Sequence, residues 1–197
     1  MTMNNILFAK TIIALCVVVF IYIFWQSVTV SSKRQIGTED GIYTNRVSTS
    51  SQELHQLTYK LTAHCNTHRC KVQSLLDYVT HIPYKINAFH TNFPQDTLNL
   101  GYGDCDDKSN LLISMLRIVG IEAYFVLVPK HIFIIVSLEK IDYAKALYID
   151  AKPYYILETT AKNSLIGFPL RYPLKDIKAI IDPFANEKIA YRTLEYQ

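Results

Sequence analysis

An uninterrupted run of uncharged residues near the amino terminus limits most strongly what this chain can fold into. Lys10 and Lys33 are separated by 22 residues that carry no acidic or basic side chain. A helix rises about 1.5 Å per residue, so this run is long enough to cross the hydrocarbon core of a bilayer, which is about 30 Å thick. Bulky apolar side chains occur on every side of such a helix and leave no polar face. The sequence therefore predicts that residues 11–32 contact the lipid bilayer.

A cleaved signal peptide is the main alternative for this run. Signal peptides have a shorter apolar region that is followed by a small-x-small cleavage site. The residues after Trp25, QSVTVSS, contain no clean site of that kind. We therefore interpret residues 1–32 as an uncleaved single-pass anchor with a short amino-terminal tail.

Charges and cysteines give opposite indications of membrane orientation. The positive-inside rule counts Lys10 before the span but Lys33 and Arg34 after it, which favours a cytoplasmic domain. The short tail and a pair of cysteines, Cys65 and Cys70, favour a domain outside the cytoplasm, because disulfides persist in oxidising compartments. We expect an inner-membrane protein with a periplasmic domain, and the cytoplasmic orientation stays open.

The chain beyond the anchor is predicted to divide into a linker and one domain. Residues 33–50 are rich in small polar side chains, which indicates a flexible linker, and residues 51–197 are long enough for one domain. The whole chain has a formal net charge of +3, but the residues after Gln35 hold equal numbers of basic and acidic side chains. A neutral domain binds polyanions poorly, so we expect no nucleic acid partner.

Helical patterns come first in residues 51–197, and strand patterns follow. Apolar residues recur every three or four positions in three segments, which predicts helices over 51–61, over 72–81 and from Cys105 to Gly120. Residues 82–103 are predicted to form a long ordered loop. Runs rich in β-branched and aromatic residues predict antiparallel strands over 121–128, 131–138, 146–150 and 154–160. We therefore expect an α+β domain in which helices pack on an antiparallel sheet.

Cys105 lies where the predicted loop ends and the third helix begins. Its sulfur would face unsatisfied backbone N–H groups and the positive end of the helix dipole, and both favour the thiolate. The neighbouring Asp104, Asp106 and Asp107 oppose this, because nearby negative charges raise the pKa of a thiol. Cys105 therefore needs a cationic partner to act as a nucleophile, and without one it is a small buried side chain.

Two further residues have the chemistry to complete a nucleophilic site with Cys105. His131 opens a predicted strand, and it can either take the thiol proton to form a thiolate–imidazolium pair or serve only a structural role. A carboxylate can hold the ring in place by accepting a hydrogen bond from the imidazole nitrogen that does not take the thiol proton. Two residues qualify, namely Glu158 at the end of an apolar strand and Asp150 before a turn. We favour Glu158, because an acid in an apolar setting is costly unless it is paired, whereas turns recruit Asp for other reasons.

These residues carry a family resemblance. The string GYGDCDDKSNLLISMLRIVGIEAYFVLVPKHIFIIV, followed by YYILETT, resembles the transglutaminase-like cysteine peptidase superfamily over residues 70–169. Members show Gly-Asp-Cys at a helix start, a His that opens a strand and an acid before Thr on a later strand. Cys105 matches the family nucleophile, His131 matches the base, and Glu158 stands where many members have Asp-Pro-Thr. The change from Asp to Glu lengthens the acidic arm by one methylene.

The resemblance implies a papain-like fold and a thioester mechanism. Thiolate attacks an amide carbonyl, and water or an amine then resolves the thioester, which makes the enzyme either a hydrolase or a transglutaminase. Prokaryotic relatives favour hydrolysis. We expect a membrane-anchored cysteine hydrolase, a peptidase or amidase, that acts on a peptide or protein. The alternative is an inactive module of this fold that holds a partner in a membrane complex.

Four candidate metal ligands lie within the seven residues HCNTHRC, from His64 to Cys70. Ligands so close together rarely surround one tetrahedral ion unless a second cluster helps. We therefore favour a disulfide between Cys65 and Cys70, with zinc binding and free thiols as the alternatives. The sequence also lacks a glycine-rich phosphate loop, and it predicts neither a metal nor a cofactor.

Overall fold

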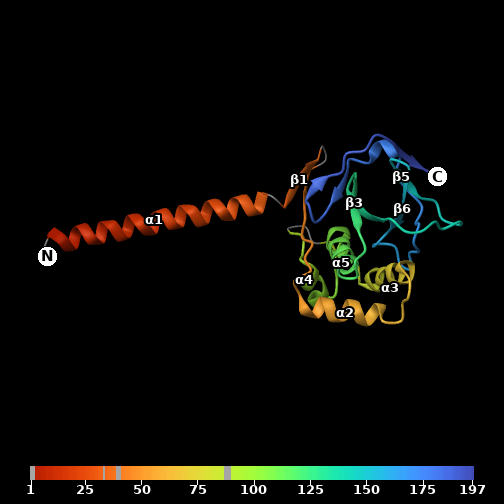
Figure 1. Ribbon diagram of the computed structural model, residues 1–197, viewed down its shortest axis with the longest axis horizontal. Coiled ribbons are helices and arrows are strands. Elements are labelled where there is room, and N and C mark those ends of the chain that lie inside the picture. Colours follow the sequence, from red (N-terminus) through yellow and green to blue (C-terminus); the bar gives the residue numbers. More distant parts are fainter. Residues whose placement is uncertain (1–2, 33, 39–40, 87–89) are drawn as a thin grey trace. The chain divides into compact units, whose positions relative to one another are not determined.

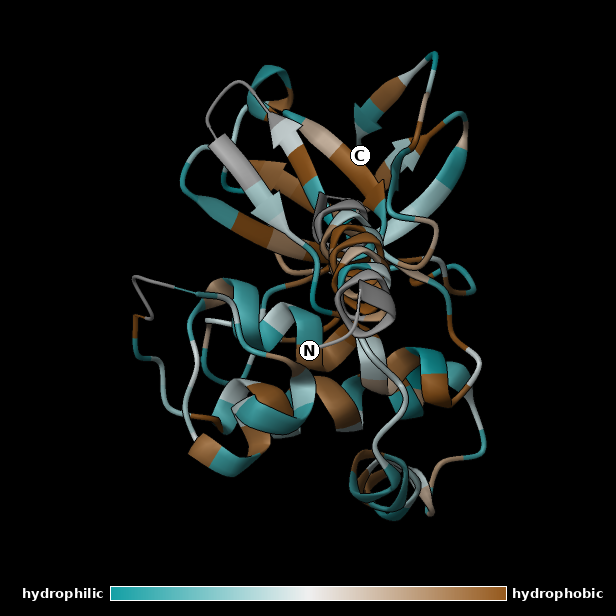
Figure 2. Ribbon diagram, turned by 90° about the vertical axis from the view of Figure 1, so that its left-hand side faces the viewer, coloured by the Kyte–Doolittle hydropathy of each residue, from teal (hydrophilic) through white to brown (hydrophobic). Residues whose placement is uncertain are grey.

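The computed structural model describes residues 3–32, 34–38, 41–86 and 90–197. It divides the chain into two compact units, Met1–Gln35 and Ile36–Gln197. The first unit holds helix α1, Met3–Ser32, and apolar residues surround its axis in the end-on view of Figure 2. The segment Lys10–Ser27 is long and apolar enough to cross a membrane, a property that signal sequences share. Helix α1 is therefore a candidate membrane span by length and composition.

Four helices form one layer of the second unit (Figure 1). Polar side chains cap two of them, because Ser51 accepts a hydrogen bond from the backbone N–H of Leu54 and Thr67 accepts one from that of Cys70. Gly120 follows the last helix in the left-handed conformation, with φ of 77°, that often ends helices. The bounds are α2 Gln52–Thr62, α3 His68–His81, α4 Pro94–Leu100 and α5 Cys105–Ile118.

The second layer is a curled antiparallel sheet of seven strands in the order β8-β7-β3-β4-β6-β5-β9. The four predicted strands correspond to β3 through β6, and the other three lie in a tail whose sequence signals are weak. A short 3₁₀ helix, η1, covers Leu174–Asp176. The strands are β3 Ala123–Val128, β4 His131–Val136, β5 Leu147–Ile149, β6 Lys152–Leu157, β7 Ala179–Asp182, β8 Glu187–Lys188 and β9 Leu194–Tyr196.

Both faces of this sheet are covered by apolar side chains. Ile134 on β4 belongs to a core cluster with Leu112 of α5, so one face packs against the helices. Phe133, its neighbour on β4, points to the other face and joins a second cluster with Phe168 and Tyr172 from the chain after β6. Helices packed on an antiparallel sheet confirm the predicted α+β fold class.

Residues 33–50, which the sequence suggests as a flexible linker, hold two short strands in the structure. Strand β1 covers Gln35–Thr38 and pairs with β2, Gly41–Thr44. Ile36 and Tyr43 are buried in the same core cluster as α5. Two large apolar side chains in a polar stretch therefore tie most of this range to the second unit, because their burial outweighs the polar composition around them.

Residues 82–103, predicted as a loop, also contain regular structure. The short helix α4 begins with Pro94, which suits the first turn of a helix because it needs no backbone N–H there. Gly101, in the left-handed conformation, ends it. A seven-residue helix has too few positions for apolar periodicity, so its signal lay only in these two end residues. The three residues 87–89 of the predicted loop lie outside the described part of the chain.

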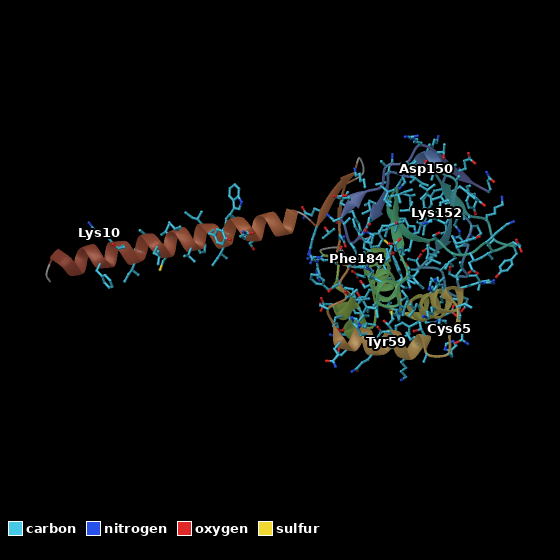
Figure 3. The ribbon with its side chains drawn as sticks, viewed as in Figure 1. Lys10, Tyr59, Cys65, Asp150, Lys152 and Phe184 are labelled. Carbon is cyan, nitrogen blue, oxygen red and sulfur yellow. A yellow bond between two sulfur atoms is a disulfide. The ribbon has the colours of Figure 1, made fainter. Side chains whose placement is uncertain are left out.

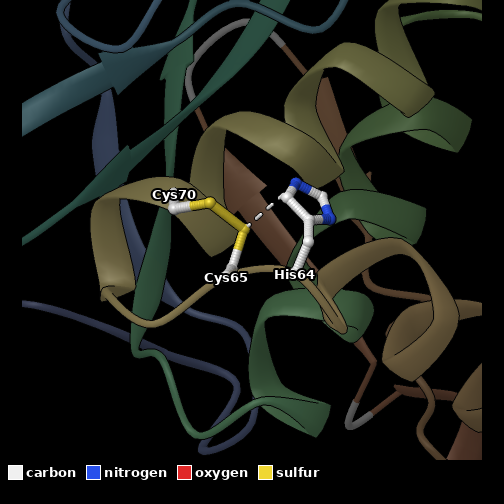
Figure 4. Close-up of side chains that lie close together, drawn as sticks. All are labelled: His64, Cys65 and Cys70. Atoms are coloured by element: carbon white, nitrogen blue, oxygen red, sulfur yellow. Dashed lines mark hydrogen bonds between the residues drawn. A yellow bond between two sulfur atoms is a disulfide. The ribbon is translucent and has the colours of Figure 1, made fainter.

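The pair Cys65 and Cys70 is joined by a disulfide that closes the turn between α2 and α3 (Figure 4). His64 Nε2 lies 3.5 Å from Cys65 Sγ. These three residues are the group of metal-type ligands that the described residues bring together. Both sulfurs are used in the bond between them, so in this state they offer no thiolate to a metal.

Candidate active site

Cys105 is the first residue of α5, and its position depends on a tightly built helix start. Asp104 accepts hydrogen bonds from the backbone N–H groups of Asp106 and Asp107, and Asp107 in return accepts one from Asp104. This reciprocal capping box satisfies donors that the helix cannot satisfy itself. Gly103 is required before it, because a Cβ there would lie 2.7 Å from Cβ of Asp107. The acidic residues around the cysteine therefore define where the helix begins.

The thiol of Cys105 is half-buried and points to an acid. Its Sγ donates a hydrogen bond to Oδ1 of Asp106 at 3.6 Å. Burial raises the pKa of the Cys105 thiol to about 12, and the negative charges of Asp106 and Asp104 add to the rise. The sequence suggests that the helix start lowers the pKa of this thiol and that the neighbouring acids raise it. In the structure, burial and the acids prevail, so the thiol carries its proton at neutral pH.

Asp106 is itself perturbed by the same crowding. Burial raises the pKa of its carboxyl to about 6, and the charge of Asp104 raises it further. The thiol of Cys105 and the imidazole of His131 act in the opposite direction. His131 therefore lies near enough to Asp106 for their charges to interact, although the two residues are 25 positions apart along the chain.

His131 and Glu158 form a hydrogen-bonded pair at the end of the sheet. His131 begins β4, Glu158 directly follows β6, and the antiparallel register of these strands brings the two ends together. Nε2 of His131 lies 2.8 Å from Oε2 of Glu158. The other carboxylate oxygen, Oε1, accepts hydrogen bonds from the backbone N–H of Thr160 at 2.9 Å and from its hydroxyl at 2.6 Å. The whole carboxylate is therefore held in one orientation.

These hydrogen bonds lower the pKa of Glu158. Burial would raise the pKa of this carboxyl, but the hydrogen bond and charge of His131, together with both donors of Thr160, hold it below its usual value. The ionised form of Glu158 therefore stabilises the fold above the usual pKa of a glutamate, and this contribution is lost as the pH falls through the lowered value. Glu158 is therefore a carboxylate at neutral pH.

The thiol, the imidazole and the carboxylate share one region of the molecule. Because Nε2 of His131 is bonded to Glu158, Nδ1 is the ring nitrogen that remains for another partner. Within the described part of the chain, the thiol donates to Asp106 and makes no hydrogen bond to His131. A rotation of the Cys105 side chain away from the acid is therefore needed before sulfur and imidazole can exchange a proton.

Tyr172 joins these groups and was not anticipated from the sequence. Its ring is stacked on that of His131, with 6.1 Å between the ring centroids and 19° between the planes. Burial raises the pKa of the Tyr172 hydroxyl, and the charges of Glu158 and Cys105 raise it further. Tyr172 thus lies beside all three residues. Its only local signal is an aromatic side chain between two prolines, Pro169 and Pro173, in a segment with no periodicity.

Asp150, the other carboxylate considered for the third role, lies elsewhere. It is an exposed turn residue with φ of 47°, and its Oδ1 accepts hydrogen bonds from the backbone N–H groups of Arg192 at 2.8 Å and Thr193 at 2.9 Å. Figure 3 shows it at the sheet end of the domain. Its contacts are those of a turn acid that holds the chain before β9, so the structure does not bring it to His131.

The chain after α3 runs beside the residues that precede Cys105. Pro83 O accepts a hydrogen bond from the backbone N–H of Gly103, and Lys85 donates its own to Gly103 O, so the two segments run side by side. Tyr84 between them is half exposed, and burial followed by the charge of Cys105 raises the pKa of its hydroxyl. Tyr84, which follows α3, and Tyr172, which precedes η1, therefore both lie near Cys105 although they are distant in the sequence.

Comparison with known proteins identifies the class of fold. Residues 55–132 match the family model of the transglutaminase-like superfamily. The match contains Cys105 and His131 and ends before Glu158. Together with the helices packed on a curled antiparallel sheet, it defines a transglutaminase-like fold. No curated protein matches the chain.

The solved structures similar to this chain include three from different bacteria. A candidate protease from Parabacteroides distasonis is 16% identical, with a TM-score of 0.46, and the alignment covers 72% of this chain and 28% of that one. A candidate cysteine protease from Cytophaga hutchinsonii is 18% identical, with a TM-score of 0.43 and coverages of 77% and 52%. LapG from Legionella pneumophila is 12% identical, with a TM-score of 0.45 and coverages of 64% and 80%. The chain thus spans about a quarter and about half of the length of the first two.

Proposed function

We propose that this chain is a membrane-anchored cysteine hydrolase that cleaves an amide bond in a peptide or protein. Cys105 is the nucleophile, His131 is the base and Glu158 orients and stabilises the imidazole. The observation that carries the proposal is the 2.8 Å bond between His131 Nε2 and Glu158 Oε2 beside a cysteine at a helix start. A buried carboxylate that holds one imidazole nitrogen leaves the other to act as a base.

The raised pKa of Cys105 determines how the first step proceeds. The resting thiol is protonated, so the proton passes to Nδ1 of His131 as sulfur attacks the carbonyl carbon, and the attack needs no preformed thiolate–imidazolium pair. The backbone N–H of Cys105, at the first position of α5, has no intrahelical acceptor and is available to the developing oxyanion. Glu158 stabilises the imidazolium that forms.

The remaining steps return the proton and release the acyl group. The imidazolium of His131 donates its proton to the departing amide nitrogen, which leaves as a free amine while the acyl group stays on Cys105 as a thioester. His131 then takes a proton from water as the water oxygen attacks the thioester carbon, and it passes that proton to sulfur as the carbon–sulfur bond breaks, which restores the thiol. The products are a carboxylic acid and an amine. We expect no metal or cofactor in these steps.

The membrane arrangement is part of the proposal. Residues 11–32 of α1 would span the inner membrane once, and the second unit would lie in the periplasm, where an oxidising compartment suits the disulfide between Cys65 and Cys70. A reporter fused after Gln197 that is active only outside the cytoplasm should therefore be active in intact cells. A signal from a reporter that works only in the cytoplasm would reverse this orientation.

Labelling of Cys105 by a substrate-like electrophile tests the catalytic assignment. We expect peptidyl vinyl sulfones, incubated with the full chain at pH 7, to form a covalent adduct that peptide mass mapping locates on Cys105. The other free cysteine, Cys16, provides the matched control, since Cys16→Ser should leave the labelling unchanged and Cys105→Ser should abolish it. Equal labelling of both cysteines would contradict a selective nucleophile.

An inactive binding module is the second candidate function, and the geometry of the thiol favours it. Cys105 donates to Asp106 instead of His131, and burial raises its pKa to about 12. A protein that uses the fold only to hold a partner in a membrane complex needs no activation of this thiol. Under this alternative, Cys105→Ala would retain partner binding and phenotype, and no electrophile would label Cys105 selectively.

A further inference from the structure

Two cavities share part of their lining, and the first of them is lined by the His131–Glu158 pair. The first has a volume of about 320 Å³ and is lined by His131 and Glu158 at one end. The second has a volume of about 680 Å³ and extends along the chain after β6. Residues 168–170 line both cavities. We call the two together the wall groove, and residues 162–172, which line it along its length, the wall segment.

The wall segment is held in place by backbone hydrogen bonds. Gly167 and Phe168 both donate their N–H groups to the carbonyl of Ile156 on β6, at 3.0 and 3.1 Å. Gly167 has a φ of 83°, and a Cβ there would lie 2.5 Å from Cβ of Ala144, so only glycine fits this approach. A wall that is already ordered costs little entropy when a ligand binds against it.

A side chain of α3 fixes the same segment from the helical layer. The amide of Gln73 donates to the carbonyl of Ser164 at 2.9 Å and accepts from the N–H of Ile166 at 3.0 Å. Ser164 is among the residues that line the second cavity, and its hydroxyl is buried and has no hydrogen-bond partner among the described residues. A buried hydroxyl without a partner is costly, and a polar ligand group would supply the missing partner.

Cations outnumber acids along the wall groove. Lys145 and Lys162 line the second cavity, and Arg171 lines the first. None of these three cations belongs to an ion pair within the described part of the chain. Glu158 is the acidic residue of the lining, and His131 already holds it. The groove therefore offers a ligand three cations outside ion pairs, against one carboxylate that His131 holds, on a domain whose overall charge is neutral.

Apolar side chains line the same two cavities. Tyr143 and Leu165 are 73% and 66% exposed on the second cavity, and Phe133 and Ile156 form apolar lining of the first. Exposed apolar side chains of this size are typical of binding surfaces when they gather at a cavity. A ligand that suits the groove therefore combines negative charges with apolar groups.

We propose that the wall groove binds an acidic segment of the peptide substrate that also carries apolar side chains. The proposal rests on the proposed function, because it assigns the substrate class of the same site. His131, which must return a proton to the departing amine, lines the first cavity. The groove therefore holds the leaving-group side of the substrate, and the acidic residues follow the cleaved bond. Continuity with this catalytic pair favours a peptide over an anionic lipid as the occupant.

Peptide binding that needs no turnover tests this assignment. The full chain with Cys105→Ser, in phosphatidylcholine nanodiscs, would be titrated into fluorescein-labelled twelve-residue peptides, and anisotropy would report binding. One peptide alternates Glu with Leu, a second replaces each Glu by Lys, and a third replaces each Leu by Ser. We expect the Glu–Leu peptide to bind at least about tenfold more tightly than either of the others, since the groove matches both features.

Charge reversal in the groove gives the decisive comparison. Lys145→Glu/Lys162→Glu should weaken binding of the Glu–Leu peptide about tenfold or more, whereas Lys60→Glu/Lys152→Glu, with the same charge change at exposed sites that line neither cavity, should leave it within about twofold. Equal weakening by both double variants, or no preference among the peptides, would overturn the proposal. Displacement of the peptide by short-chain phosphatidylserine at equal or lower concentration would overturn it in favour of a lipid.

The binding experiment separates this proposal from the proposed function. Selective labelling of Cys105 with no preference for acidic peptides would remove the substrate class and leave the hydrolase intact. Acidic peptide binding without any labelling of Cys105 would keep the groove as a binding surface and remove the hydrolase.

Discussion

The Glu158→Gln variant should hydrolyse peptides about 10³- to 10⁴-fold more slowly than the wild-type chain. Gln preserves the size of the side chain but replaces the charged acceptor that holds Nε2 of His131 at 2.8 Å. Without it the imidazole loses its orientation, and the imidazolium that forms during attack loses its counter-charge, a change that costs about four orders of magnitude in other triads. Initial rates on a peptide library, read by mass spectrometry, measure the effect.

Asp150→Asn provides the control for that experiment. Asp150 is the other carboxylate that the sequence allows in the third role, and the structure engages it with Arg192 and Thr193 instead. We expect hydrolysis by Asp150→Asn to stay within about twofold of wild type, since an exposed turn acid contributes nothing to the imidazole. The reverse pattern, a slow Asp150→Asn and an unaffected Glu158→Gln, would exchange the two assignments.

The Asp106→Asn variant should make Cys105 more reactive, by about ten- to a hundredfold in its alkylation rate at pH 7. Asp106 accepts the thiol hydrogen bond at 3.6 Å, and its negative charge adds to burial in raising the pKa of the thiol to about 12. Removal of one like charge at this distance lowers a pKa by about one to two units, and the thiolate fraction rises in proportion. Iodoacetamide alkylation, followed by mass spectrometry in a Cys16→Ser background, measures it.

The same variant should be more stable at neutral pH. Burial raises the pKa of Asp106 to about 6, so its ionisation costs free energy that grows as the pH rises from the unfolded value to the folded one. At about 1.4 kcal/mol per pKa unit, the penalty at pH 7 is about 3 kcal/mol, an order-of-magnitude figure. Denaturant unfolding of the full chain at pH 7 and pH 4 should show the gain at pH 7 only. Asp96→Asn, an exposed acid on α4, should change neither stability nor alkylation.

Much of the fold follows from patterns that a few neighbouring residues determine. The apolar repeats and end residues of α2, α3 and α5, and the β-branched runs of β3 through β6, report local geometry directly. Cys105 at a helix start and His131 at a strand start follow from the same signals. The partnership of His131 with Glu158 followed from chemistry, because an acid in an apolar strand needs a partner.

The elements that the sequence did not reveal depend on contacts distant in the chain. Strands β7 and β9 pair with β3 and β5, which lie tens of residues earlier, so their short apolar runs have meaning only inside the sheet. Tyr172 lies beside His131 because the wall segment is attached to β6 and α3, and no local rule predicts that attachment. The hydrogen bond from Cys105 to Asp106 depends on the side-chain rotamer of Cys105, which the sequence pattern does not predict.

The pH dependence of Cys105 alkylation, compared between the wild-type chain and His131→Ala, tests most directly whether sulfur and imidazole act together. Both proteins would carry Cys16→Ser, and second-order rate constants would be measured from pH 5 to pH 11. Because His131 takes the thiol proton as sulfur attacks, His131→Ala should react about tenfold more slowly at pH 7, and the two profiles should converge at alkaline pH as the thiol ionises unaided. Profiles that coincide at every pH would show that His131 has no influence on the sulfur and would contradict the hydrolase.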